Sequence, residues 1–188
     1  MFNYLSEEYV SIFTFLNLFK YITFRTGAAT LTALFFSLIF GELIIKKLSM
    51  LQPSGQPIRI DGPLSHLTKK SGTPTMGGIL ILASLGISLF LWADLKNQFV
   101  WICFITSIIF GTIGFVDDFI KVKFKSSKGI KASSRILIQI IFGLIIIFFI
   151  QKILPNNLVF QINLPFFKDL IVNFGIFYYF LGVFIIVG

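Results

Sequence analysis

Two adjacent acidic residues, Asp117 and Asp118, stand at the end of an apolar stretch that runs from Phe99 to Val116. Ionisable side chains at a membrane boundary are costly without a use, which makes them candidates for a functional site. Five lysines follow along the chain, at Lys121, Lys123, Lys125, Lys128 and Lys131. Carboxylates that could bind a metal or a proton therefore stand beside cations that could bind phosphate. This combination predicts phosphoryl chemistry at a membrane surface.

The spacing of these residues predicts that they have different roles. Consecutive residues of a helix point about 100° apart, so Asp117 and Asp118 cannot face one atom with equal ease. We expect one to act chemically and the other to position it. Lys121 lies four residues after Asp117 and three after Asp118, so it shares a helical face with them if the helix continues past the membrane boundary. The alternative is an acid pair that ends a span in water and makes a weak surface ion pair.

A second candidate site is the polar segment Lys69–Gly78. Thr73 suits the N-cap and Pro74 the first position of a helix, so the second span is expected to start here with free backbone N–H groups. A helix N-terminus beside Lys69 and Lys70 favours anions such as a diphosphate. The alternative is that the two lysines only mark the cytoplasmic side of the membrane. His66 is the only histidine, so imidazoles cannot build a metal cluster in this chain.

The composition predicts an all-α integral membrane protein. The chain is 56% hydrophobic and 13% charged, with a mean hydropathy of +0.91, whereas soluble domains are about 25% charged. Unpaired backbone groups are excluded from hydrocarbon, and the apolar segments lack the alternation of a barrel strand. We therefore predict one membrane domain over residues 1–188, a polytopic bundle of about five transmembrane helices. The expected spans are Thr26–Leu48, Met76–Trp92, Phe99–Val116, Ile136–Leu154 and Leu170–Val187.

The connections have expected roles of their own. Tyr9–Phe24 is aromatic but interrupted by polar residues, which predicts an interfacial helix. The inner loop 49–74 is rich in proline and glycine and is expected to fold over the site. Residues 117–135 form an inner basic loop that carries the acidic pair. The outer segment 155–167 predicts a short hairpin, with an irregular loop as the alternative.

The distribution of basic residues predicts the orientation in the membrane. Eleven of the sixteen Lys and Arg residues fall in the two loops 49–74 and 117–135 or directly beside them, and cytoplasmic segments carry such an excess. The N-terminus is then outside, and the acidic pair is cytoplasmic. The net charge of +8 does not indicate nucleic-acid binding, because the basic residues alternate with hydrophobic spans. The lipid bilayer is the expected partner of these spans.

Several motifs resemble the phospho-N-acetylmuramoyl-pentapeptide transferases, a bacterial family within the polyprenyl-phosphate sugar-1-phosphate transferases. The resemblance covers essentially the whole chain. The motifs are Arg25–Thr30, Gly55–Arg59, Asp61–Pro63, His66–Leu67, Lys69–Gly78 and Gly114–Asp118 with Lys121. The resemblance implies transfer of phospho-N-acetylmuramoyl-pentapeptide from UDP-N-acetylmuramoyl-pentapeptide to undecaprenyl phosphate, with release of UMP. This is the first membrane step of peptidoglycan synthesis, and it implies Mg2+ and the cytoplasmic face of the bacterial inner membrane. Another UDP-sugar transferase of the superfamily is the alternative within this class.

The resemblance also implies roles for individual residues. Asp117 and Asp118 would be catalytic, and Asp117 is our choice for activating the acceptor phosphate. Whether such an acid is a base, a nucleophile or a metal organiser stays open, and either aspartate is a candidate metal ligand. The expected phosphate contacts are Lys70, Lys121 and Lys125, with Lys69 and Thr75 beside them.

The chain also departs from the family pattern. The family has more spans than the five read here, and its later acidic motif and its histidine-containing inner loop are absent from this sequence. We therefore expect the N-terminal half of a larger transferase, which would insert into the membrane and be inactive alone. A second copy of the chain is a candidate partner. The rival reading is a nonenzymatic membrane module, either a remnant or a structural or channel-forming bundle.

Overall fold

The computed structural model describes residues 2–9, 13–52, 55, 74–125, 129–156, 158–163 and 171–188. The chain divides into two compact units, residues 1–130 and residues 131–188, which are described separately. Helices account for most of the described residues in each unit. The prediction of an all-α fold is therefore confirmed.

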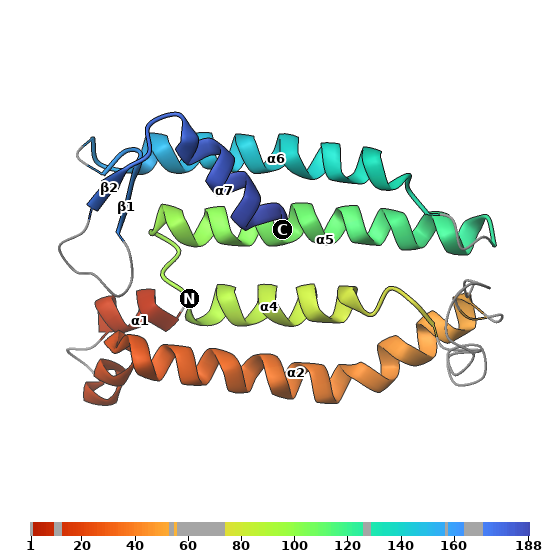
Figure 1. The fold of residues 1–188 in the computed structure, drawn as a ribbon. Helices are drawn as coiled ribbons and strands as arrows, with labels where there is room; N and C mark the ends of the chain where they lie inside the picture. Colours follow the sequence, from red (N-terminus) through yellow and green to blue (C-terminus); the bar gives the residue numbers. More distant parts are fainter. Residues whose placement is uncertain are drawn as a thin grey trace. The chain divides into compact units, whose positions relative to one another are not determined.

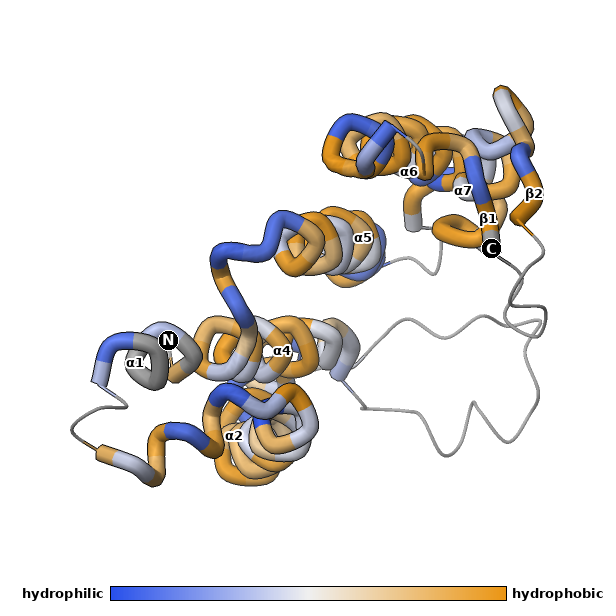
Figure 2. The backbone as a smooth tube through the Cα atoms, turned by 90° about the vertical axis from the view of Figure 1, so that its left-hand side faces the viewer, coloured by the Kyte–Doolittle hydropathy of each residue, from blue (hydrophilic) through white to orange (hydrophobic). Residues whose placement is uncertain are grey.

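Unit 1 contains the acidic pair and is built around three helices. Its elements are α1 (Phe2–Tyr9), the 3-10 helix η1 (Thr14–Lys20), α2 (Ile22–Leu51), α4 (Gly78–Trp92) and α5 (Gln98–Lys123). Helix α4 packs against both α2 and α5, and it runs antiparallel to each (Figure 1). Consequently α2 ends, α4 begins and α5 ends at the same end of the unit, which we call the site end. Figure 2 shows that the three helices are hydrophobic along most of their length, with hydrophilic residues in the connection between α4 and α5.

Close contacts at small residues hold these helices together. A Cβ added at Gly86 of α4 would lie 3.5 Å from the Phe104 ring of α5, and one at Gly111 of α5 would overlap the Leu82 side chain of α4. Association in lipid relies on such packing, because hydrocarbon offers little hydrophobic drive between helices. Glycines thus allow α4 and α5 to approach each other closely.

Unit 2 consists of two helices and a strand pair. Its elements are α6 (Ala132–Ile153), β1 (Gln161–Asn163), β2 (Ile171–Asn173) and α7 (Phe177–Val187). The strands are antiparallel, with Ile162 opposite Val172. Helix α7 packs on α6, where Ile147 is buried and contacts Gly182. The predicted hairpin therefore exists, but its second strand lies beyond the expected range 155–167.

The helices have the character of membrane spans. Helices α2, α5 and α6 are long and apolar enough to cross a bilayer, and most of their apolar side chains lie on the surface rather than inside the fold. Such an outward apolar surface is stable in lipid and not in water. Helices α4 and α7 are apolar too, but with 15 and 11 residues they are shorter than the roughly 20 residues of a full span. The chain is a multi-pass membrane protein.

The N-terminal prediction was wrong in detail. Tyr9–Phe24 does not form one interfacial helix, because the segment contains η1 and the start of α2, which begins at Ile22 instead of Thr26. The rings of Phe19 and Phe24 pack on Trp92 of α4, with centroids 5.6 Å and 6.2 Å away. These tertiary contacts explain why the segment follows the bundle instead of forming a separate helix.

The boundaries of other elements also differ from those predicted. The last helix begins at Phe177 instead of Leu170, because residues 171–173 pair with β1. Helix α2 extends to Leu51 and α4 begins at Gly78, so the first inner connection is shifted along the chain from the expected loop 49–74. Helix α5 extends to Lys123 and α6 begins at Ala132, so the second connection is shorter than the expected loop 117–135. Residues 56–73 lie outside the described part of the chain, and the folding of that loop over the site stays a prediction.

Candidate active site

Asp117 is held by two contacts near the end of α5. Its side chain is 8% exposed, and its Oδ2 lies 2.6 Å from Nζ of Lys121, one helical turn further along. Its Oδ1 accepts a hydrogen bond of 2.7 Å from the backbone N–H of Ile130. Ile130, which lies between α5 and α6, thus packs against this carboxylate.

Gly129 is the reason that the connection can approach so closely. A Cβ added at Gly129 would overlap Oδ1 of Asp117 and would lie 2.8 Å from Cε of Lys121. Any side chain at this position would force the carboxylate or the lysine to move. The buried geometry of Asp117 therefore depends on a glycine twelve residues further along the chain.

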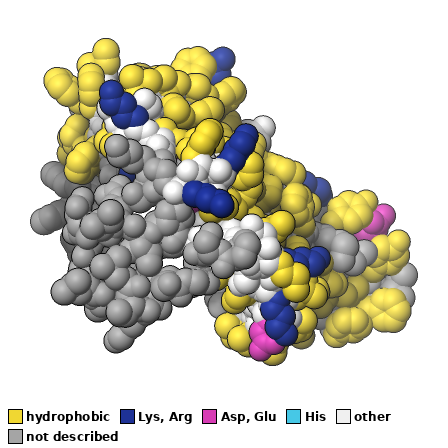
Figure 3. All heavy atoms as spheres, turned by 90° about the vertical axis from the view of Figure 1, so that its right-hand side faces the viewer, with side chains coloured by type: hydrophobic (Ala, Val, Ile, Leu, Met, Phe, Trp, Pro, Cys, Tyr) yellow, Lys and Arg dark blue, Asp and Glu magenta, His cyan; other side chains and the backbone are white. Residues whose placement is uncertain are grey.

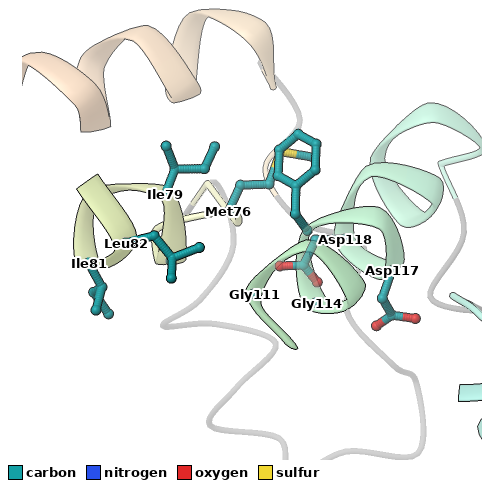
Figure 4. A pocket seen from close by; sticks show the side chains of 10 residues that line it. Met76, Ile79, Ile81, Leu82, Gly111, Gly114, Asp117 and Asp118 are labelled. Atoms are coloured by element: carbon teal, nitrogen blue, oxygen red, sulfur yellow. The ribbon is translucent and has the colours of Figure 1, made fainter. Parts of the chain in front are cut away.

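Asp118 has a different environment from its neighbour. Its side chain is 31% exposed, and its Oδ1 lies 3.2 Å from Nζ of Lys121. Its Oδ2 accepts a hydrogen bond of 2.5 Å from the Thr75 hydroxyl, which comes from the segment before α4. Lys121 thus bridges both aspartates, while one acid is buried and the other is accessible. Figure 4 shows the two carboxylates leaving α5 in different directions.

Thr75 is itself anchored by Gln52, the residue directly after α2. The backbone N–H of Thr75 donates to Oε1 of Gln52 at 2.9 Å, and Nε2 of Gln52 donates to the Thr75 carbonyl at 3.4 Å. Gln52 is buried. The contacts of Gln52, Thr75 and Asp118 therefore join the end of α2, the segment before α4 and the end of α5 at the site end.

A pocket of about 400 Å3 lies between α4 and α5 beside the acidic pair (Figure 4). Its walls are mainly apolar, and both aspartates line it as well. The lining residues are Met76, Gly78, Ile79, Ile81, Leu82, Gly111, Gly114, Phe115, Asp117 and Asp118. The site thus joins an apolar cavity to a pair of carboxylates bridged by a lysine.

Comparison with known proteins decides the family to which this arrangement is related. Residues 70–82, which include Thr75 and the α4 wall of the pocket, match the model described as "Phospho-N-acetylmuramoyl-pentapeptide-transferase signature 1". The chain is 48% identical over 172 residues to the phospho-N-acetylmuramoyl-pentapeptide-transferase of Rickettsia akari (strain Hartford). The chain is homologous to the phospho-N-acetylmuramoyl-pentapeptide-transferases. The match covers 92% of this chain and 47% of the relative, so the chain spans about half the length of that transferase.

The structure describes some of the residues that the sequence predicts as phosphate contacts. Thr75 lies against Asp118, so its hydroxyl donates to an acid and not to an open site. Lys121 contacts both acids, as its spacing predicts. Lys125 lies exposed in the turn after α5, with φ +47°, and it makes no ion pair with either aspartate among the described residues. Lys69 and Lys70 lie outside the described part of the chain.

The prediction of a helix starting at Pro74 was wrong. Pro74 and Thr75 precede the helix, and α4 begins at Gly78. Met76 has φ +73°, in the left-handed region that a non-glycine side chain rarely adopts. The contacts of Thr75 with Gln52 and Asp118 hold this conformation against the local helix signal. The signature of the transferases therefore spans a strained turn followed by a helix.

Sequence reasoning missed Gln52, Gly129 and Ile130. Gln52 lies 23 residues before its partner Thr75, and Ile130 lies 13 residues after Asp117. Such contacts depend on how the connections turn, which no local pattern encodes. The glycine after the cluster of lysines was the one available signal, because a glycine can mark a close approach of the backbone.

Proposed function

We propose that this chain supplies part of the active site of a phospho-N-acetylmuramoyl-pentapeptide transferase. The reaction moves phospho-N-acetylmuramoyl-pentapeptide from UDP-N-acetylmuramoyl-pentapeptide to undecaprenyl phosphate. The observation that carries the proposal is the contact between Thr75 of the signature and Asp118, because it joins the family motif to an ion-paired acidic site. A remnant without function would not need this buried polar arrangement beside an apolar pocket.

The chemistry explains why such a site is needed. An oxygen of the acceptor phosphate attacks the phosphorus that carries the sugar, and the bond from that phosphorus to the oxygen of UMP breaks. Both reactants are anions, so the protein has to align them and to offset their repulsion. Lys121 supplies a positive charge between the aspartates, and Lys123 and Lys125 follow it at the site end. These groups suit the handling of phosphates at a membrane surface.

Magnesium fits the donor set that the described residues offer. Among them, no three Asp, Glu, His or Cys side chains cluster around one point. Mg2+ often keeps several waters and binds through one or two carboxylates together with substrate phosphates. Asp118, the more exposed acid, would hold the ion, with Asp117 beside it. When bound, the ion would offset the negative charge of the reacting phosphates.

The pocket supports a lipid substrate in the same place. Its apolar walls on α4 and α5 suit a polyprenyl chain, and its acidic end is where the phosphate of that lipid would meet a metal ion. A soluble sugar nucleotide alone would not need such walls. The arrangement is therefore more consistent with a lipid phosphate acceptor than with a site for two water-soluble substrates.

The charges of unit 1 support a cytoplasmic position for the site. Lys46 and Lys47 near the end of α2 lie at the site end together with the lysines that end α5. Figure 3 views the structure from the side of the site end and shows Lys and Arg side chains among apolar ones. Cytoplasmic segments carry such an excess of basic residues. We infer that the site faces the cytoplasm of a bacterial cell from its inner membrane.

Thiol labelling in intact cells tests this orientation. In a protein with Cys103 replaced by alanine, the single substitutions Lys47→Cys and Lys125→Cys each introduce one cysteine at the site end. Both cysteines should resist an impermeant maleimide, because the site end is proposed to face the cytoplasm. A cysteine at Lys96→Cys, exposed in the connection at the opposite end of unit 1, should be labelled. Disrupted cells provide the control, since all three cysteines should then react. If only the site-end cysteines were labelled in intact cells, the orientation would be the opposite of the one proposed.

Transfer of labelled phospho-sugar to the lipid acceptor tests the proposed reaction directly. The 188-residue chain and a chimaera are compared, the chimaera being this chain in place of the matching half of the Rickettsia akari transferase. Purified protein, undecaprenyl phosphate and Mg2+ are supplied with UDP-N-acetylmuramoyl-pentapeptide, and transfer of labelled phospho-sugar to the lipid is followed. We expect transfer by the chimaera and none without the lipid acceptor. Transfer of a different UDP-sugar alone would assign another substrate, and no transfer by either protein would refute the proposal.

A further inference from the structure

We propose that Gln52 is a positioning residue that fixes Thr75 and, through it, the catalytic carboxylate of Asp118. This inference rests on the proposed function and extends it to a residue outside both the signature and the acidic motif. Gln52 directly follows α2 and is 4% exposed, so it lies inside the protein and not at the lipid surface. A buried amide is unfavourable unless its polar atoms are paired.

The two contacts of Gln52 require an amide. Its Oε1 accepts from the Thr75 N–H at 2.9 Å, and its Nε2 donates to the Thr75 carbonyl at the longer distance of 3.4 Å. Only asparagine and glutamine carry an acceptor and a paired donor at one side-chain end. The Gln52 amide therefore pairs with both the N–H and the C=O of Thr75, as the backbone of a neighbouring β-strand can. The two backbone groups need this partner, because Thr75 lies outside α4 and is partly buried.

Thr75, held in this way, places its hydroxyl against Asp118. Thr75 Oγ1 donates to Oδ2 of Asp118 at 2.5 Å, which leaves Oδ1 to face Lys121. The next residue, Met76, has φ +73°, a conformation that persists only where surrounding contacts enforce it. Without Gln52 this turn can relax, and the hydroxyl then leaves the carboxylate. Gln52 thus acts on Asp118 through Thr75 and touches neither carboxylate in the contacts described.

Gln52→Met tests the inference, because methionine has a similar volume and neither donor nor acceptor of useful strength. Replacing a residue that forms a hydrogen bond to a metal ligand typically lowers metal affinity or activity by about 10- to 100-fold. We expect Gln52→Met in the chimaera to lower kcat by that factor and to raise the Mg2+ concentration needed for half-maximal rate. The matched control is Gln151→Met in α6. Gln151 is also buried but has no hydrogen-bond partner for its side chain in the described structure, so its replacement should leave the Mg2+ dependence unchanged.

A double-mutant cycle separates positioning from general stability. Thr75→Val removes the hydroxyl and keeps the shape, whereas Thr75→Ser keeps the hydroxyl and should retain activity within a few-fold. If Gln52 acts through Thr75, adding Gln52→Met to Thr75→Val should cause little further loss. The inference would be overturned if the two losses of activity multiplied in the double variant. It would also be overturned if Gln52→Met left kcat and the Mg2+ dependence unchanged.

Amide hydrogen exchange tests the anchor without any activity. In the 188-residue chain in detergent, Gln52→Met should speed exchange of the Thr75 N–H by about tenfold, the scale of one lost hydrogen bond. Gln151→Met should leave that rate unchanged. If neither the chain nor the chimaera transfers phospho-sugar, the proposed function fails, and the exchange rate still decides whether Gln52 holds Thr75. Unchanged exchange in Gln52→Met would refute the anchor itself.

Discussion

Replacing Asp117 with asparagine is expected to abolish most of the transfer activity of the chimaera. The amide keeps the size of the side chain and can still accept from the Ile130 N–H, but it removes the charge that pairs with Lys121 at 2.6 Å. A positioned acid or base contributes about 10²- to 10⁴-fold to a rate, and we expect a loss of kcat within this range. The measurement is transfer of labelled phospho-sugar at saturating substrates over a series of Mg2+ concentrations.

The dependence on Mg2+ distinguishes the roles that Asp117 could have. If excess Mg2+ restores the rate, Asp117 organises the metal; if the loss persists, it handles a proton or the acceptor directly. Asp94, in the exposed connection at the opposite end of unit 1, provides the control, because Asp94→Asn should leave kcat unchanged. Full turnover of Asp117→Asn at every Mg2+ concentration would remove this residue from the mechanism.

The sequence alone predicts the membrane character and the helices of this protein. Apolar segments of sufficient length have few other stable structures in lipid, because every backbone group must be paired within the segment. The contact of Lys121 with both aspartates also follows from spacing, since residues three and four apart share a helical face. Local periodicity therefore accounts for the spans and for the ion pairs within α5.

The parts that could not be predicted depend on contacts between distant segments. The local signal at Pro74 favours a helix start, yet Thr75 is held in a turn by Gln52 and Asp118. The strand formed by residues 171–173 lies within an apolar run that reads as a span, and it is decided by pairing with β1. In each case a tertiary hydrogen bond outweighs a weak local preference, which a single sequence does not reveal.

The difference between the two acids is also a tertiary effect. Their sequence contexts are nearly identical, but the connection after α5 covers Asp117, while the segment before α4 contacts Asp118. Their spacing predicts that one acid acts and the other positions it, and only the family resemblance favours Asp117 as the acid that acts. In the structure, Asp118 is the more exposed of the two, and Asp117 is the more firmly held. The different environments of the two acids are therefore set by the segments that contact them and not by the helix that carries both residues.

Gly129→Ala is expected to impair the site while leaving the fold intact. The glycine has no positive φ, so alanine fits its backbone conformation, and the atoms nearest to the added methyl group belong to the Asp117 and Lys121 side chains. Those ends can move, but the carboxylate then loses its bond of 2.7 Å from the Ile130 N–H. A displacement of about 1 Å can lower a rate on the order of 100-fold, so we expect a loss of that size in kcat.

A glycine with a close contact outside the site supplies the control for this change. A Cβ at Gly182 in α7 would lie 2.7 Å from Cδ1 of Ile147, an apolar side chain of unit 2. Gly182→Ala should lower the thermal unfolding temperature slightly and leave the Mg2+ dependence of transfer unchanged, because it disturbs packing and no charge. Gly129→Ala should show the opposite pattern, an unfolding temperature near that of the unaltered protein and a much lower kcat. Equal activity of the two variants would mean that the close approach of Gly129 to Asp117 has no part in catalysis, since the carboxylate would then tolerate displacement.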